Sequence, residues 1–149
     1  MVHVTEIPNQ LGDWLGISVA QAEDGACRVL FDDDAVDFQP AGRTLFLVSD
    51  LGSALEKEEE NAALLRANCC GAETLGAVIG LDAERQTLTL HMMLTGSMVK
   101  EEFEELLAAF LKAVRYWKAW VAADPVASSR EAPGLAAGTP SGADGFLAV

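Results

Sequence analysis

The feature that most constrains the fold of this chain is a long apolar stripe across residues 99–121. Its members recur at steps of three and four residues, which is the spacing of one face of an α-helix. They are Val99, Phe103, Leu106, Phe110, Val114, Trp117 and Val121. Glutamates occupy the first half of the segment and Lys and Arg the second half, which complements the helix dipole. The stripe therefore predicts a helix that buries one face against the rest of the domain.

Three extended stretches are predicted in the first half of the chain, separated by segments with turn chemistry. The stretches are 17–21, 26–31 and 43–49, and the separators are 23–25, 32–34 and 40–42. A short edge strand around Asp37 is a further expectation. In 26–31 and 43–49 both alternating sets of side chains are largely apolar, so these strands need cover on two sides.

Two more helices and two more strands complete the predicted domain. A short helix at 7–15 has apolar residues at helical spacing, a proline in its first turn and Gly16 at its end. Ser53 and Glu56 have the spacing of a capping box, which predicts a helix from there to about Cys69, ended by Gly71 in a left-handed turn. The two strands are 75–81 and 87–93, joined by a hairpin turn at 82–85.

The element order predicts an α+β fold over residues 1–123: helix, three strands, helix, two strands, helix, with an antiparallel sheet flanked by helices. From Asp124 onward the composition changes to Ala, Gly, Ser and Pro with no apolar period. Such a segment cannot bury enough apolar surface to offset the entropy of ordering it. Residues 124–149 are therefore predicted to be a disordered tail.

Acidic residues dominate the charge of the chain, with 23 Asp and Glu against 10 Lys and Arg, a formal net charge of −13. They recur in short runs beside apolar residues, at 32–34, 58–60 and 101–102, so they belong to the folded surface. Their potential repels phosphate backbones and anionic lipid, so neither nucleic acid nor a membrane is an expected partner. A basic polypeptide would be attracted; alternatively, the runs only keep the domain soluble.

The cysteines and the N-terminus indicate a reducing compartment. Cys27, Cys69 and Cys70 are odd in number, and adjacent cysteines rarely have the geometry to bridge each other, so a disulfide framework is not expected. The first residues lack the basic and apolar regions of a signal peptide, and no segment approaches membrane-spanning length. A cytoplasmic protein is expected.

Groups that could carry catalysis or bind a cofactor do not converge in the sequence. His3 and His91 are far apart, the paired cysteines lack the two-residue gap typical of zinc sites, and run 76–80 lacks the Lys-Ser or Lys-Thr of a phosphate loop. No catalytic residue, metal site or cofactor is therefore expected. The alternative is a small enzyme that uses carboxylates in a cleft, such as Glu56 or Asp82, and it requires a pocket in which their pKa values are raised.

Local patterns in the second half of the chain resemble a known family. They are the run LLRAN at 64–68, the glycine-punctuated run GAVIGLD at 76–82, and the apolar residues Leu88, Leu90, Phe103, Leu106, Phe110 and Trp117. With the element order and the acidity, they make the chain similar to the class I type III secretion chaperones, the Tir chaperone family of the CesT and SycE kind. The resemblance covers about residues 7–122, and the cysteines at 69 and 70 depart from it.

The resemblance implies a homodimer that binds the N-terminal region of a secreted effector, keeps it soluble and partly unfolded, and supports its export without a cofactor. For effector contact we expect the apolar side chains Leu11, Trp14, Val29, Phe31, Leu45 and Leu47. For the dimer interface we expect Leu64, Leu65 and Asn68. Ordinary core packing is the alternative for each residue, and a YbjN-like sensory or protein-binding module without a dedicated effector is the alternative for the function.

Overall fold

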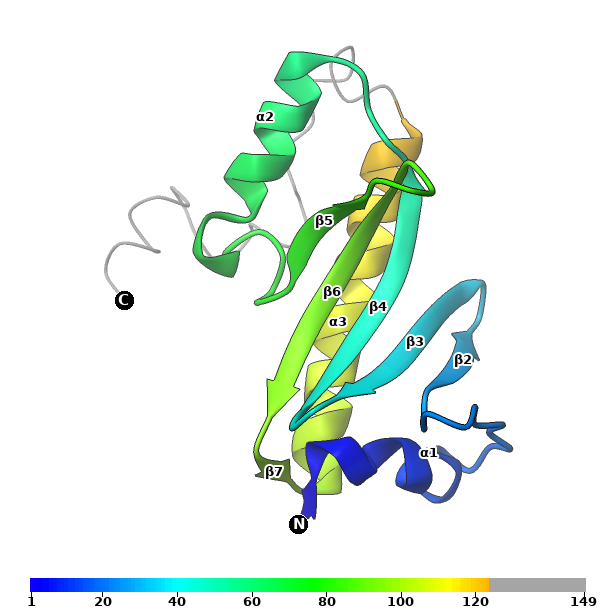
Figure 1. The fold of residues 1–149 in the computed structure, drawn as a ribbon. Coiled ribbons are helices and arrows are strands. Elements are labelled where there is room, and N and C mark those ends of the chain that lie inside the picture. Colours follow the sequence, from blue (N-terminus) through cyan, green and yellow to red (C-terminus); the bar gives the residue numbers. More distant parts are fainter. Residues whose placement is uncertain (124–149) are drawn as a thin grey trace.

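A five-stranded antiparallel sheet lies along one long helix, α3 (Lys100–Ala122), in the computed structural model of the chain (Figure 1). The structure describes residues 1–123, and the predicted tail at 124–149 lies outside the described residues. In spatial order the strands are β2 (Cys27–Phe31), β3 (Asp34–Ala41), β4 (Thr44–Ser53), β6 (Thr87–Thr95) and β5 (Val78–Asp82). Strands β2 and β5 are therefore the two edges of the sheet.

The remaining elements lie at the ends of the sheet. Helix α1 (Ile7–Leu15) follows a 3-10 turn, η1 (Val4–Glu6), and lies near the beginning of α3, while α2 (Glu58–Ala67) lies beside β5 (Figure 1). A second 3-10 turn, η2 (Cys69–Gly71), follows α2. A small ribbon of β1 (Val2–His3) and β7 (Ser97–Met98) joins the N-terminus to the start of α3.

The core lies between α3 and the inward face of the sheet, as the apolar stripe predicted. On α3, Phe103, Phe110 and Val114 are fully buried. The stripe is confirmed with two differences: Leu107 is buried whereas Leu106 is only partly buried, and Val99 is the partly buried N-cap that precedes the helix. The sheet contributes fully buried side chains at alternate positions, namely Val36, Phe38, Leu45, Leu47 and Leu90. Burial of this apolar area is the main term that stabilises the fold.

The predicted element order is confirmed, but one of the three strands before α2 is a different segment. Residues 17–21 form no strand, and only Gln21 makes an isolated bridge, to Cys27. The expected short strand around Asp37 is instead the eight-residue β3, which pairs with β2 on one side and β4 on the other. Pro40 lies within β3, so the turn to β4 is shorter than the predicted separator.

Helix α2 begins later than the capping-box pattern predicted. Ser53 is the last residue of β4, and the helix begins at Glu58 after Lys57 as N-cap. The pairing of β4 with β6 continues to Ser53 across a bulge between Asp50 and Gly52, so the backbone of Ser53 is used in the sheet. Gly71 has the left-handed φ of 73° that was predicted for the end of this region.

An indole fixes the loop between α2 and β5 onto α3. Trp117, 3% exposed, donates from Nε1 to the backbone oxygen of Glu73 at 2.9 Å. Thr74, fully buried in the same loop, donates from Oγ1 to the backbone oxygen of Ala77 at 2.6 Å. The loop that precedes β5 is thus attached to α3 by the Trp117 hydrogen bond and is held internally by the buried hydrogen bond of Thr74.

Trp117→Phe should lower the free energy of unfolding by about 1–3 kcal/mol, because it leaves the part-buried Glu73 carbonyl without its donor and removes part of a buried ring. Urea denaturation measures the change. Trp14→Phe, at a partly exposed ring that packs on Phe103, is the matched control and should cost less. Equal losses for the two variants would contradict the assigned role of the Trp117 hydrogen bond.

Candidate partner-binding site

Among residues 1–123, no strand pairs with the outer edge of β2, so this edge presents free main-chain groups. A two-residue turn, with Asp32 at φ 58°, joins β2 to β3 and makes Phe31 and Asp34 the closing pair. Hydrogen-bonded and non-hydrogen-bonded pairs alternate in an antiparallel ladder, so Val29 pairs inward through its backbone while Arg28 and Leu30 direct their N–H and C=O groups away from β3. The edge therefore offers the N–H and C=O groups of two residues, Arg28 and Leu30, to an added strand.

The segment before β2 is consistent with this alternation. Ala26, two residues before Arg28, accepts on its backbone oxygen from the N–H of Ala22 at 2.8 Å. The segment 17–26 thus covers the beginning of the edge and leaves the stretch at Arg28 and Leu30 open.

A groove of about 610 Å³ lies beside this open stretch. Its lining comes from the loop after α1 and from the strands β2 and β3: Ile17, Ser18, Arg28, Val29, Leu30 and Ala35. Leu30 is 70% exposed and Ile17 is 41% exposed, so two large apolar side chains face solvent next to the free backbone groups. An extended apolar peptide fits both features of this edge.

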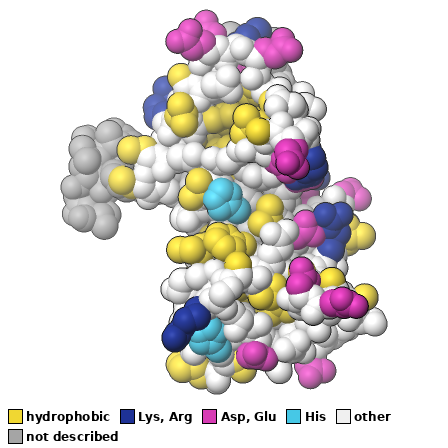
Figure 2. Space-filling view, in the orientation of Figure 1, with side chains coloured by type: hydrophobic (Ala, Val, Ile, Leu, Met, Phe, Trp, Pro, Cys, Tyr) yellow, Lys and Arg dark blue, Asp and Glu magenta, His cyan; other side chains and the backbone are white. Residues whose placement is uncertain are grey.

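The outward face of the sheet carries an apolar strip and an ion-paired side. Figure 2 shows hydrophobic side chains along the middle of this face and charged side chains along one side. The strip includes Phe46 opposite Met93, and Val48 in line with His91 and Val78. Met93 is 56% exposed and Val78 is 44% exposed. Contiguous exposed apolar surface of this kind often marks an interaction site.

The charged side consists of two sets of carboxylate–guanidinium pairs. Arg28 binds Asp37 through two hydrogen bonds of 2.6 and 2.9 Å. Arg85 binds Asp50 at 2.8 and 3.0 Å and Asp82 at 2.7 Å, and these carboxylates raise its pKa. Hydrogen bonds from Arg85 lower the pKa of Asp82. This is opposite to the raised carboxylate pKa that the enzyme alternative required.

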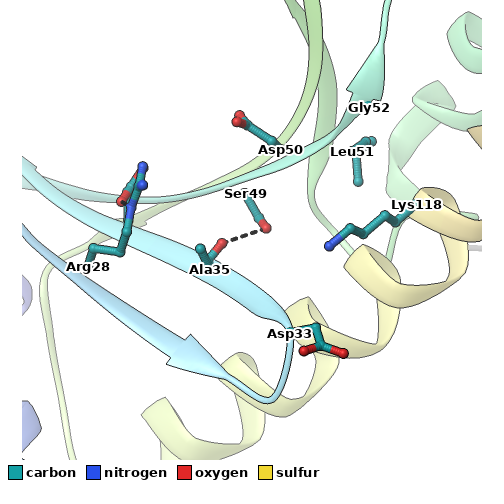
Figure 3. Close-up of a pocket in the computed structure, with 9 residues that line it drawn as sticks. Arg28, Asp33, Ala35, Ser49, Asp50, Leu51, Gly52 and Lys118 are labelled. Atoms are coloured by element: carbon teal, nitrogen blue, oxygen red, sulfur yellow. Dashed lines mark hydrogen bonds and ion pairs between the residues drawn. The ribbon is translucent and has the colours of Figure 1, made fainter.

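Strands β3 and β4 separate at one end, and a cavity of about 250 Å³ lies in the gap, where most of the lining residues are charged or polar (Figure 3). Their paired register ends at Asp37 and Val48, and beyond it Ser49 donates from Oγ to the backbone oxygen of Ala35 at 2.7 Å. Figure 3 shows Lys118 of α3 reaching toward this gap.

The charges at the gap connect the β2–β3 hairpin to α3. Asp34, 7% exposed, accepts from Lys118 Nζ and from Arg115 Nε, each at 3.1 Å. A buried carboxylate that accepts hydrogen bonds from two cationic donors is satisfied by charge-assisted bonds. The gap is thus held together by ion pairs within the chain.

The structure places the six expected effector contacts in two groups. Leu11, Leu45 and Leu47 are fully buried and Val29 is 5% exposed, so these four side chains belong to the core of the chain. Trp14 and Phe31 are partly exposed at the rim of the core. Effector contact by these residues stays a prediction. The exposed Leu30 and Ile17, beside the same edge, were missed, although the apolar pattern of both faces of β2 pointed to Leu30.

The three expected dimer residues also differ in exposure. Leu64 is 5% exposed and faces the core, whereas Leu65 is 72% exposed on the outer side of α2. Asn68 is partly buried and uses its carboxamide within the chain, on the backbone of Ile79. Their contact with a second copy stays a prediction, for which Leu65 is the available apolar side chain.

Within residues 1–123, no group of three or more His, Cys, Asp or Glu side chains comes together that could hold a metal ion. Burial, with a smaller effect of Asp37, raises the pKa of Cys27, and burial lowers the pKa of His91. The exposed Cys69 and Cys70 are free thiols. Over the same described residues, no helix has the length and apolarity to cross a membrane.

Solved structures with the same fold include chains of type III secretion complexes and one other protein, YbjN. A chain of the HopA1–SchA chaperone–effector complex has a TM-score of 0.63 and 17% identity, over 77% of this chain and 94% of that one. The Yersinia pestis type III secretion chaperone SycH, in complex with a fragment of YscM2, gives 0.59 and 19%, over 75% and 98%. YbjN from E. coli gives 0.62 and 15%, over 87% and 96%. At these identities the likeness establishes the fold alone.

Sequence comparison decides the family. No curated protein matches the chain. The family of the Tir chaperone protein (CesT) matches residues 7–118, which contain α1, the whole sheet, α2 and most of α3. The match therefore spans the free β2 edge, its groove and the outward face, and the chain belongs to the Tir chaperone protein (CesT) family.

Proposed function

We propose that this protein is a type III secretion chaperone that binds the N-terminal region of an effector by adding an effector strand to the free edge of β2. The observation that carries the proposal is the pair of outward main-chain sites at Arg28 and Leu30, next to a groove of about 610 Å³ with exposed apolar side chains. Membership of the Tir chaperone family and the chaperone–effector complexes among its structural relatives support it.

Binding of this kind keeps an effector segment extended. Main-chain hydrogen bonds to β2 supply affinity for any extended backbone, while Leu30 and Ile17 select apolar side chains at alternate positions. A segment bound in this way cannot form its own core or aggregate through its apolar residues. The chemistry needs no cofactor and no catalytic residue, so we propose a binding protein and not an enzyme.

The proposed chaperone acts as a homodimer in the cytoplasm. The outer side of α2 with Leu65, and the apolar strip of the outward face, are the surfaces that a second copy would cover. A formal charge of −13 keeps the unloaded protein soluble and attracts basic effector segments. The YbjN likeness leaves a protein-binding module without an effector as the second candidate.

The test is purification of the tagged chain from its own host, with mass spectrometry of what co-purifies and hydrogen exchange of the complex. We expect near-stoichiometric recovery of a larger protein, protection of its N-terminal segment from protease, and slower exchange at the amides of Arg28 and Leu30 only in the complex. Cells that express the tag alone give the background. Recovery of the chain without any such protein, while secretion is induced, would favour the YbjN-like module.

A further inference from the structure

The second edge of the sheet is already occupied by a side chain. Strand β5 is the edge opposite β2, and the carboxamide of Asn68 lies against it. Asn68 Nδ2 donates to the backbone oxygen of Ile79 at 2.8 Å, and the N–H of Ile79 donates to Asn68 Oδ1 at 2.7 Å. One planar amide therefore makes the same two hydrogen bonds that a residue of a neighbouring strand would make.

This contact occupies one of the two positions at which the main chain of β5 could pair with an added strand. Ile79 is opposite Leu90 on β6, and its N–H and C=O face Asn68, so this pair is a non-hydrogen-bonded pair of the β5–β6 ladder. The alternation then directs only Ile79 and Leu81 outward among the five residues Val78–Asp82. Asn68 takes the first of these two positions. A strand added here would have only Leu81 left for its main chain.

A rigid turn holds Asn68 in place. It is the C-cap of α2, and the backbone after it turns back through left-handed residues, Cys70 at φ 54° and Gly71 at φ 73°. The N–H of Gly76 donates to the oxygen of Gly71 at 3.0 Å, and a Cβ on Gly71 would lie 3.0 Å from the Cα of Gly76. The close approach of these two glycines brings the end of α2 beside the start of β5.

The chemistry at this site requires an amide. A carboxamide has a donor and an acceptor in one plane, as a peptide group has, whereas a carboxylate accepts only and an alkyl group does neither. Proteins with free edge strands block them against unwanted pairing by local devices. By contrast, the β2 edge has its two outward positions, Arg28 and Leu30, beside an open groove.

We propose that Asn68 is an edge-blocking residue, whose carboxamide takes the place of an added strand at Ile79 and so confines strand addition to β2. The part of this inference that concerns β2 rests on the proposed function; the part that concerns β5 does not. Loss of the amide opens both outward positions of β5 and allows copies of the chain to pair edge to edge.

The test uses the full chain and needs no effector. In Asn68→Ala the amide of Ile79 should exchange with solvent roughly tenfold faster or more, since its acceptor is gone. Sedimentation velocity over a range of concentrations should show species larger than the wild-type assembly. Adding Leu81→Pro should reverse this association, because proline removes one of the two outward N–H groups of β5, its ring obstructs an approaching strand, and it is tolerated at an edge. Asn61→Ala, on the same helix, is the matched control; its side-chain amide donates to the Leu55 oxygen at 3.2 Å and, among residues 1–123, makes no hydrogen bond with β5.

Two outcomes would overturn the inference. The first is an Asn68→Ala protein with the wild-type exchange rate at Ile79 and the wild-type assembly at every concentration. The second is association that Leu81→Pro leaves unchanged, which would mean that the copies associate through another surface. Neither outcome bears on effector binding at β2, which is tested by substitutions at Leu30, so failure of one proposal is distinguishable from failure of the other.

Discussion

Leu30→Pro is expected to weaken effector binding about fivefold or more while leaving the chain folded. The N–H of Leu30 points away from β3, so proline at this position removes no hydrogen bond of the sheet. It does remove one donor from the edge, and its ring obstructs an approaching strand. A main-chain hydrogen bond that is lost with its acceptor buried costs about 1–3 kcal/mol, a factor of roughly 5–150 in affinity. Isothermal titration of the purified chain with the N-terminal segment of its co-purified effector measures the change.

Two variants separate the main-chain effect from other effects of Leu30→Pro. Leu30→Ala removes the same exposed side chain but keeps the N–H, and should lose less affinity than the proline variant. Leu81→Pro places proline at an outward position of the other edge strand and should leave effector affinity unchanged. Equal affinity for Leu30→Pro and Leu30→Ala would show that the effector does not pair with the main chain of β2.

Alternation of apolar and polar residues predicted some strands of the sheet better than others. Residues 87–93 alternate clearly and form most of β6, because Leu88, Leu90 and Met92 face one core. Strand β3 was expected only as a short edge strand around Asp37, because 32–34 and 40–42 were assigned to turns. In the structure Asp37 faces outward and pairs with Arg28, so its charge is compatible with a strand between two others. A cross-strand ion pair of this kind depends on register, which a single sequence does not give.

The assignment of faces limited the prediction of the site. In β4 both alternating sets are apolar, Leu45 and Leu47 against Phe46 and Val48, so the sequence alone could not decide which set is buried. The structure decides it because α3 covers one face of the sheet (Figure 1). Leu45 and Leu47 lie under α3, and Phe46 and Val48 are left outward. The effector contacts predicted on β4, Leu45 and Leu47, are therefore core residues of the chain. The other alternating set, Phe46 and Val48, belongs to the outward face, and the sequence pattern alone did not identify it as such.

Asn68 illustrates a second limit. The sequence places it at the end of a helix, where asparagine commonly caps the backbone. Its actual partner, Ile79, is eleven residues away, and the contact depends on the left-handed turn at Cys70 and Gly71. Glycine spacing predicted a turn in this region but not the strand edge that it would bring beside Asn68. Side chain to backbone contacts across such turns become visible only in three dimensions.

Leu65→Asp is expected to convert the proposed dimer, with twice the 15.8 kDa mass of the chain, into monomer. Leu65 is 72% exposed on α2, so an aspartate there is harmless to an isolated chain. In a two-fold interface the substitution occurs twice, and each carboxylate would be buried against apolar surface without a partner. The penalty should weaken the dimer about a hundredfold or more, which corresponds to roughly 3 kcal/mol. Sedimentation equilibrium measures the dissociation constant.

Leu30→Asp is the matched control for this prediction. Leu30 is 70% exposed and lies on β2, the edge strand opposite to β5, beside which α2 lies. The same substitution at nearly the same exposure should leave the dimer intact, so a general effect of added charge is excluded by comparison. A dimer that survives Leu65→Asp but dissociates with Met93→Asp would move the interface from α2 to the apolar strip of the outward face. Dissociation by Leu30→Asp alone would place the interface at the β2 edge and make dimerisation and strand addition mutually exclusive.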